Sequence, residues 1–517
     1  MRRITLLILF ISLSSLTVYA QYSKADSLKL VRYIQYREEV DSLYRQSTNT
    51  LNVVEWNMVG NGSYDNSNAF DSILVRAKDL NVANIYIPDG TFLCSGTFDV
   101  DGTDSTKFLK FSGEGTLLFT DTTSAGSGAS FVGTGVLTFS NFNTIILEGV
   151  TFQFRNYNIV PAGAGWSYLN GILLEENKYI WLDGITVKNA IRAGVQIYGV
   201  DYVWVTNCLF DSSTYGNLHI SKSDGSYIVG NTFSNAGATN LSYLYGYGVS
   251  LGHRHGSHRD NLNSYIAGNQ VLYNTRKGID THGSVGVIIE SNYIKGWGVS
   301  ATGGHNSPGQ HPDSAFNNIR WQKRVTDLTI INNVIENDTA WANNLTTPSN
   351  DVRGISCGNL DSSPYTMTLF SAGYIKIQDN ILRGMNAANQ RGPVIVYVGM
   401  GDSLAVNRRD PHDGITVTGN QIYDVDIDTA YYTDGTININ RYTVGYSHNK
   451  EVIIPFIDVS DNHIEGDAYI GIKVAWADSN NNAPDLKVLT VTQSTQYFSH
   501  RRNHTLDIRL AHSGKQR

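Results

Sequence analysis

The sequence is poor in charged side chains, in cysteine and in proline. Only 16% of its 517 residues are Asp, Glu, Lys or Arg, and the formal net charge is −7. This mild negative charge argues against nonspecific binding of nucleic acid, which needs an excess of basic residues. The three cysteines, Cys94, Cys208 and Cys357, are too widely spaced for a disulfide framework, so we expect them to be small buried hydrophobic residues.

Long apolar runs are missing after the N-terminus. Arg2 and Arg3 precede the run ITLLILFISLSSL, which is too short to span a bilayer and leads to the small-residue end VYA. This arrangement predicts a secretory signal peptide over residues 1–20, cleaved after Ala20. We therefore expect an exported protein, periplasmic or extracellular, with no membrane association.

Glycine (49 residues) and tyrosine (30 residues) are abundant. Together with the low charge, they suggest β-structure with tight turns rather than a helical bundle. Residues 24–46 differ, because their apolar positions follow the period of an amphipathic helix. We expect a helical segment over 21–52, a β domain over 53–498 and a tail without clear pattern over 499–517.

An asparagine recurs where a short alternating apolar strand ends, as in YIVGNTF (227–233) and LTIINNVI (328–335). We call these recurring corner positions the asparagine ladder. Successive ladder positions are 23 residues apart in two cases and 38 to 47 residues apart in the others. We infer a coil of 23 residues with insertions, typical of a parallel β-solenoid. Asparagine tolerates the left-handed backbone of a sharp corner, and stacked asparagines can hydrogen-bond to one another. The ladder positions are Cys208, Asn231, Asn269, Asn292, Asn333, Asn380, Asn420 and Asn462.

This repeat resembles the right-handed parallel β-helix proteins of the pectin-lyase-like superfamily. Residues 53–96 resemble the N-terminal cap motif of pectate-lyase-3-like proteins. The resemblance implies an all-β fold, a single-stranded right-handed parallel β-helix (β-solenoid) with an N-terminal helical cap. It also implies a polysaccharide as substrate, although lyases, hydrolases and proteins that are not enzymes share this fold. The residues that match the cap motif are Gly60, Gly62, Asp65, Asn66, Ala69, Ile85, Ile87, Pro88, Gly90, Thr91 and Phe92.

Each coil has a second strand that opens near a glycine, as in YGVSL (247–251) and KGIDT (277–281). Alternate residues of a strand face opposite ways, so apolar positions such as Ile279 point inward and their neighbours point outward to solvent. Coils stack about 4.8 Å apart, which makes the outward residues one contiguous column. We expect the column to be Gln196, His219, Ser250, Asp280 and, from NNIRW (317–321), Arg320. By contrast, the outward residues of the asparagine-ladder strands should be mostly polar or aliphatic.

Ionisable and aromatic residues gather around this column and in the insertions 252–264 and 296–317. Any one of them is explained as part of a solvated face, but several groups on adjacent coils indicate an active site. The candidate catalytic residues are Lys277, Asp280, His282, His253 and Arg320. The candidate substrate-binding residues are His219, Tyr215, Tyr247, Arg254, Arg276, His305, His311 and Asp313.

Two chemistries fit such a site. Glycoside hydrolysis needs two carboxyl groups, about 5–5.5 Å or 6.5–9.5 Å apart. β-Elimination at a uronic acid needs a cation for the sugar carboxylate, a base for the adjacent C–H proton and an acid for the leaving oxygen. The column is rich in bases and cations, and Asp280 is its only acid. The consecutive Asp pair and the G-H-G motif of polygalacturonase-like hydrolases are also missing.

The sequence therefore favours a lyase that acts on an acidic polysaccharide in a groove on the β-helix face. The expected roles are Lys277 or His282 as base, Arg320 or Arg276 as carboxylate neutraliser, and His253 or Tyr247 as acid. Asp280 would orient Lys277 or His282. One alternative is a glycoside hydrolase that uses Asp280 and a second carboxylate such as Asp313, and another is a non-catalytic glycan-binding adhesin.

Metal binding is the minority interpretation. The histidines of HRHGSH (253–258) could supply ligands, but their spacing matches no strong zinc pattern. Calcium-dependent lyases of this fold usually carry an acidic cluster on this face, and the sequence shows none there. We expect no metal and no cofactor, and calcium is the alternative. The sequence does not indicate an oligomeric state.

Overall fold

The structure is a computed structural model that describes residues 49–102, 107–120, 134–155, 169–237, 246–252, 261–282, 284–302, 326–338, 341, 354–358, 374–385, 393–399, 414–426, 436–442, 457–467, 470–475, 489–491, 496–497 and 505–509. The expected signal peptide (1–20) and amphipathic helix (24–46) lie outside this part of the chain. Within it, no helix is long and apolar enough to cross a membrane.

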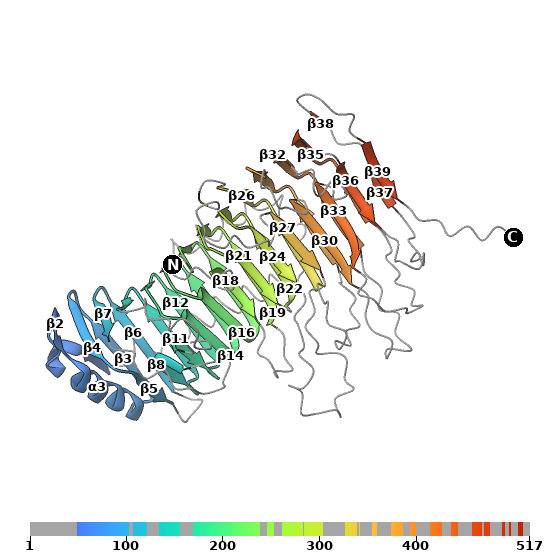
Figure 1. The fold of residues 1–517 in the computed structure, drawn as a ribbon. Coiled ribbons are helices and arrows are strands. Elements are labelled where there is room, and N and C mark those ends of the chain that lie inside the picture. The colour runs from blue at the N-terminus through green and yellow to red at the C-terminus, as the bar shows by residue number, and fades with distance from the viewer. Residues whose placement is uncertain are drawn as a thin grey trace, which may run out of the picture.

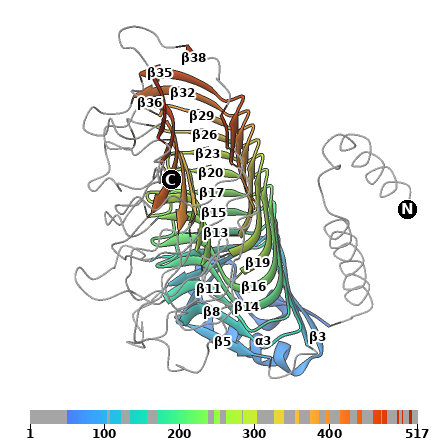
Figure 2. The same cartoon turned by 90° about the vertical axis from the view of Figure 1, so that its right-hand side faces the viewer.

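The described strands form two parallel sheets, one of 25 strands and one of 14. A coil adds one short strand to the smaller sheet and two strands to the larger, as β20 (Gln270–Leu272), β21 (Lys277–His282) and β22 (Ser284–Glu290) do. Each strand pairs in parallel with its counterparts on the coils before and after it. Figure 1 shows the resulting stack, and Figure 2 shows the smaller sheet from β13 (Thr186–Lys188) to β35 (His463–Asp467). The expected all-β solenoid is confirmed.

A helix closes the N-terminal end of the stack, as Figure 1 shows. This helix, α3 (Ser67–Asp79), packs its apolar side on the first coils, and Phe70 lies edge-on to Phe98 with ring centroids 4.9 Å apart. Just before it, the buried Asn66 side chain donates to the carbonyl oxygens of Val59 and Leu93, both at 3.1 Å. The amide thus joins the entry of the helix to the neighbouring strand. The expected helical cap is present.

Strands extend the solenoid at both ends beyond the range of 53–498. At the N-terminal end, β1 (Thr50–Asn52) pairs with β3 (Val82–Ile87). At the C-terminal end, β39 (Thr505–Arg509) pairs with β36 (Ile470–Ala475), inside the tail for which no pattern was expected. The sequence of β39, TLDIR, does alternate apolar and polar residues, but the segment is too short to stand out without a coil beneath it.

The asparagine ladder is confirmed as a continuous chain of hydrogen bonds. Both the backbone N and the side-chain Nδ2 of Asn292 donate to Oδ1 of Asn333 at 2.9 Å. Asn292 Nδ2 also donates to the carbonyl oxygen of Ile266 at 2.9 Å, and similar bonds link the ladder from Asn231 to Asn462. These buried amides saturate the backbone at a corner that water does not reach.

The expectation that the ladder residue itself takes the left-handed backbone is wrong. The residue before it does so, because the ladder side chain must turn into the stack to reach the next coil. The left-handed residues are Asn207 (φ 54), Gly230 (φ 70), Gly268 (φ 61), Ser291 (φ 53), Asn332 (φ 58), Asp379 (φ 53), Gly419 (φ 68) and Asp461 (φ 56).

The outward residues of the ladder strands also differ from expectation, because several of them are aromatic. Trp181 of β12 (Tyr179–Asp183) stacks on Trp204 of β14 (Ala193–Thr206), with ring centroids 4.4 Å apart. In the strand register, Tyr227 lies opposite Trp204, and Tyr265 lies opposite Tyr227. The ring centroids of the two tyrosines are 5.4 Å apart. In-register coils place like residues directly above one another, so rings stack where isolated strands would expose them.

All three cysteines are free and buried in the interior, as expected. Burial raises the pKa of the thiols of Cys94, Cys208 and Cys357 to about 12.

Candidate functional site

The strand register places four of the five expected column residues side by side. Gln196 lies opposite His219, His219 opposite Ser250, and Ser250 opposite Asp280. The strands that carry them are β14, β16 (Gly216–Val229), β18 (Tyr247–Gly252) and β21. This part of the predicted column is confirmed.

The fifth member of the column is Ser300, and the expectation of Arg320 is wrong. Ser300 lies opposite Asp280 on β24 (Val299–Thr302), and Ser356 of β27 (Ile355–Gly358) follows it. The sequence contained the signal, because GVS occurs at 248–250 and again at 298–300. Residues 303–325, which include Arg320, are an insertion after β24 and lie outside the described residues.

Most of the column is buried, although we expected its side chains to lie in solvent; His219 is partly exposed. Asp280 is 0% exposed, Ser250 4% and Gln196 3%. Lys277, at the start of the same strand as Asp280, is 8% exposed. Strand alternation turns these residues away from the core, but it does not determine whether other parts of the chain cover them. A buried carboxylate is stable only when it is paired with a cation or hydrogen-bonded, so Asp280 needs such partners.

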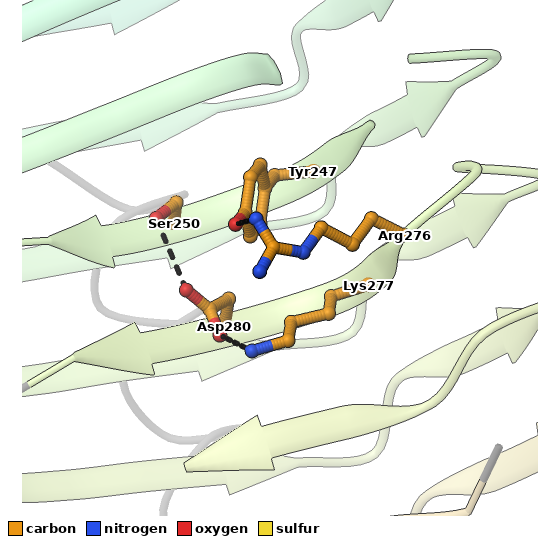
Figure 3. A network of polar contacts seen from close by, with 5 residues as sticks. All are labelled: Tyr247, Ser250, Arg276, Lys277 and Asp280. Carbon is orange, nitrogen blue, oxygen red and sulfur yellow. Dashed lines mark hydrogen bonds and ion pairs between the residues drawn. The ribbon is translucent and has the colours of Figure 1, made fainter. Parts of the chain in front are cut away.

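Asp280 has a cation on one oxygen and a hydroxyl on the other. Lys277 Nζ lies 2.9 Å from Oδ1, and Ser250 Oγ donates to Oδ2 at 3.4 Å (Figure 3). Gly278 lets the strand approach the next coil, because a Cβ there would lie 2.5 Å from the carbonyl oxygen of Trp297. The ion pair is therefore held on a closely packed strand.

Arginine and tyrosine side chains border this pair. Arg276 Nη1 donates to the hydroxyl of Tyr247, and the guanidinium carbon lies 5.0 Å from the centre of the same ring (Figure 3). Tyr247 is 5.3 Å from Tyr215, centroid to centroid, and the Arg192 guanidinium lies 5.5 Å from Tyr215. Two cations thus lie against two neighbouring phenol rings that are tilted by 49° to each other. Arg192 was not among the predicted site residues, although it occupies the same place before its strand as Tyr215 and Arg276.

His219 joins the site from the neighbouring coil. Its ring lies 6.2 Å from that of Tyr215, and its Nε2 is 3.1 Å from the hydroxyl oxygen of Ser221. The structure therefore brings together six of the predicted residues: Lys277, Asp280, Arg276, Tyr247, Tyr215 and His219. His282 ends β21, and its side chain lies outside the described part. The remaining predicted residues, His253, Arg254, His305, His311, Asp313 and Arg320, also lie outside it.

The described residues hold no group of three or more His, Cys, Asp or Glu side chains arranged to bind a metal ion. The donors that meet in the site are ammonium, guanidinium, phenol and hydroxyl groups around one carboxylate. Such a set can neutralise an anion and exchange protons.

Comparison with known proteins supports the fold. The family model described as "Right handed beta helix region" matches residues 170–340. Among curated proteins, none matches the sequence.

Several solved structures are similar at low sequence identity. The family 28 exopolygalacturonase of Yersinia enterocolitica is 11% identical, with a TM-score of 0.43, over 90% of this chain and 79% of its own. The Streptococcus pneumoniae surface adhesin PfbA is 14% identical, with a TM-score of 0.41, over 89% and 93%. The A-module of an Azotobacter vinelandii mannuronan C-5 epimerase is 12% identical, with a TM-score of 0.39, over 87% and 100%.

Proposed function

We propose that this right-handed parallel β-helix protein of the pectin-lyase-like superfamily cleaves an acidic polysaccharide by β-elimination. The observation that carries the proposal is the buried ion pair of Lys277 and Asp280, with the pair of Arg276 and Tyr247 beside it (Figure 3). These contacts put a possible base, a cation for a carboxylate and a proton donor on two adjacent coils.

The balance of charge favours an anionic substrate. Arg192, Arg276 and Lys277 bring three positive groups to the site, and Asp280 is the one acid among the described members of the column. Lys277 is paired with Asp280, and the two guanidinium groups lie against the rings of Tyr215 and Tyr247, in a chain whose net charge is −7. A polymer that carries a carboxylate on each sugar would be attracted to this face.

The reaction needs three proton and charge movements. The base removes the proton from the carbon next to the sugar carboxylate, and the electron pair forms a carbon–carbon double bond as the bond to the glycosidic oxygen breaks. That oxygen then takes a proton from the acid. We assign Arg276 to the carboxylate, Lys277 or His282 to the base, and Tyr247 or His253 to the acid.

Asp280 has a positioning role in this scheme. An ammonium group cannot accept a proton, so Lys277 acts as a base only after its own proton has moved away. Asp280 Oδ1 lies 2.9 Å from Lys277 Nζ and orients that group through the hydrogen bond. Ser250 Oγ, on the neighbouring coil, approaches the other carboxylate oxygen at 3.4 Å.

A glycoside hydrolase that uses Asp280 as acid or nucleophile is the second candidate. It is disfavoured because both oxygens of Asp280 already have partners, Lys277 and Ser250. A hydrolase also needs a second carboxylate, and the candidate Asp313 lies outside the described residues. A non-catalytic glycan-binding adhesin is the third, and it would use the same face for binding alone.

The products of cleavage separate the three candidates. The full chain would be incubated with polygalacturonate, alginate and neutral glycans, and both ultraviolet absorbance and reducing ends would be followed. Elimination gives unsaturated ends that absorb, hydrolysis gives reducing ends without absorbance, and binding without either favours the adhesin.

Variants then test the roles within the enzyme. Lys277→Ala should abolish elimination, whereas Lys222→Ala should not, since Lys222 forms an exposed pair with Glu176 at 3.0 Å. If Asp280→Asn abolishes activity while Lys277→Ala does not, the hydrolase roles replace those of the lyase.

We also propose that the protein works outside the cytoplasm, in the periplasm or beyond, on the basis of the sequence of residues 1–20. N-terminal sequencing of the exported protein should begin at Gln21. A cytoplasmic product that retains Met1 and its apolar run would contradict this.

A further inference from the structure

A second cluster of aromatic and charged side chains lies at the corner where the smaller sheet leads into the site strands. Tyr273 directly follows β20, and Lys295 ends β23 (Tyr293–Lys295) on the next coil. Asp338 and Trp341 come after β26 (Val334–Glu336), one coil further. Tyr273 precedes Arg276 by three residues, so the cluster lies at the corner that leads into β21, the strand of Lys277 and Asp280.

The aromatic part of the cluster is a pair of tilted rings. The centroids of Tyr273 and Trp341 are 5.5 Å apart and their planes meet at 57°. Asp338 Oδ1 accepts from the backbone N of Trp341 at 3.0 Å, which ties the indole to the corner. Both rings are partly exposed. Part of each side chain is therefore accessible at this corner.

The polar part consists of one cation and one carboxylate with long contacts. Lys295 Nζ lies 3.8 Å from Asp338 Oδ2 and 5.4 Å from the centre of Tyr273. The hydroxyl of Tyr273 lies 3.5 Å from the same Asp338 oxygen. The side chains of Lys295 and Asp338 are 32% and 28% exposed. Contacts of this length are weak, so a hydroxyl group of a ligand can compete for either partner.

A neighbouring carboxylate on the same sheet, that of Glu336, has shorter contacts. Glu336 accepts from the hydroxyl of Tyr293 at 2.7 Å through one oxygen and pairs with Arg383 at 3.3 Å through the other. Those partners saturate Glu336 and lock adjacent coils together. Asp338 Oδ2 thus has longer contacts than either oxygen of Glu336.

We propose that Tyr273, Lys295, Asp338 and Trp341 form a subsite for one sugar ring of the polymer, next to the bond that is cleaved. The ring would stack on Trp341, and Lys295 and Asp338 would donate to and accept from its hydroxyl groups. Apolar walls with a few convergent polar groups are the usual composition of such sites. This inference rests on the proposed function for the identity of the polymer, but its test does not depend on cleavage.

Binding to the full chain tests the subsite. Affinity for polygalacturonate, alginate and a neutral β-glucan would be measured by affinity electrophoresis for the wild type, Trp341→Ala, Trp341→Phe and Lys295→Met. We expect Trp341→Ala to weaken binding of one polymer about tenfold, with Trp341→Phe in between. Tyr423→Ala is the matched control, because Tyr423 packs on His463 at 5.6 Å on the same sheet, farther along the stack.

The outcomes separate this proposal from the proposed function. If the polymer is cleaved and Trp341→Ala has the affinity and KM of the wild type, the cluster has only a structural role at this corner. The subsite proposal is then overturned. If no polymer is cleaved but Trp341→Ala still weakens binding, the subsite stands and the lyase proposal fails. Binding of none of the three polymers, or equal loss in Tyr423→Ala, also overturns the subsite. Where cleavage occurs, KM should rise with kcat nearly unchanged.

Discussion

The Nζ of Lys277 lies 2.9 Å from Oδ1 of Asp280, and both side chains are buried on the outer side of the strand rather than in the core. Removing two charges from water has a large cost, which their attraction only partly offsets. Placement of such a pair beside the side chains of Arg276 and Tyr247 is therefore better explained by function than by stability.

Breaking the pair should destabilise the protein strongly. Lys277→Met leaves the carboxylate of Asp280 buried without its cation, and we expect a loss of about 3–5 kcal/mol in the free energy of unfolding. Replacing both residues, as Lys277→Met with Asp280→Leu, should recover much of that loss. Urea unfolding measures both. The exposed Lys222→Met should cost less than about 1 kcal/mol, and an equal loss at Lys222 and Lys277 would contradict the buried pair.

Substitution of a ladder asparagine should destabilise the protein, whereas substitution of the residue just before it should have little effect on stability. Asn333→Ala removes an acceptor for Asn292 and the donor to the carbonyl of Ile289, so we expect a loss of about 3 kcal/mol. Asn332→Gly should change stability by less than about 1 kcal/mol, because Asn332 already has a left-handed backbone (φ 58) that glycine adopts freely. Thermal unfolding of the two variants gives the comparison. Similar losses at both positions would mean that the corner depends on backbone conformation alone.

The cysteines should be unreactive in the folded protein. Burial raises the pKa of Cys94, Cys208 and Cys357 from 9.0 to about 12, so each thiol stays protonated where an exposed cysteine would begin to ionise. Their contribution to stability is complete below about pH 9 and is lost as the pH rises toward 12. Iodoacetamide near pH 8 should label none of them before unfolding and all of them afterwards, as mass spectrometry would show. Rapid labelling of any one in the native state would contradict its burial.

The stability of the N-terminal cap should fall in acid because Asp65 becomes protonated. A hydrogen bond from the Ser67 hydroxyl, with further bonds from the backbone N of Ser67 and of Ser95, lowers the pKa of Asp65 below 3.8. The stabilisation is therefore present above the ordinary pKa and is lost as the pH falls through the lowered one. Ser67→Ala should reduce the loss of stability on acidification, and Asp65→Asn should reduce it further. Melting temperatures at neutral and acidic pH test this, and wild-type acid sensitivity in both variants would contradict it.

The repeat could be predicted from the sequence because each coil repeats the same local pattern. Alternation around Ile279 and the regular Asn positions specified strands, corners and register without any knowledge of the whole fold. A helical cap was also expected, and the helix over 67–79 provides one.

The candidate site was predicted less completely, because strand alternation gives direction but not burial. It placed Ser250 and Asp280 side by side, yet gave no sign that Asp280 is 0% exposed. The long insertion after Thr302 hid the short strand of Ser300 and made Arg320 seem the next column residue. The stack of Trp181 and Trp204 was missed for a related reason, since two rings 23 residues apart meet only when the coils are aligned.

The most direct test of the account is the product formed from a uronate polymer. The full chain and its Lys277→Ala variant would be incubated with polygalacturonate and with alginate, and ultraviolet absorbance and reducing ends would be recorded together. The account predicts that absorbance and reducing ends rise in equal proportion with one of these polymers, and that Lys277→Ala produces neither. Reducing ends that form without absorbance, or an undiminished rate in Lys277→Ala, would contradict it.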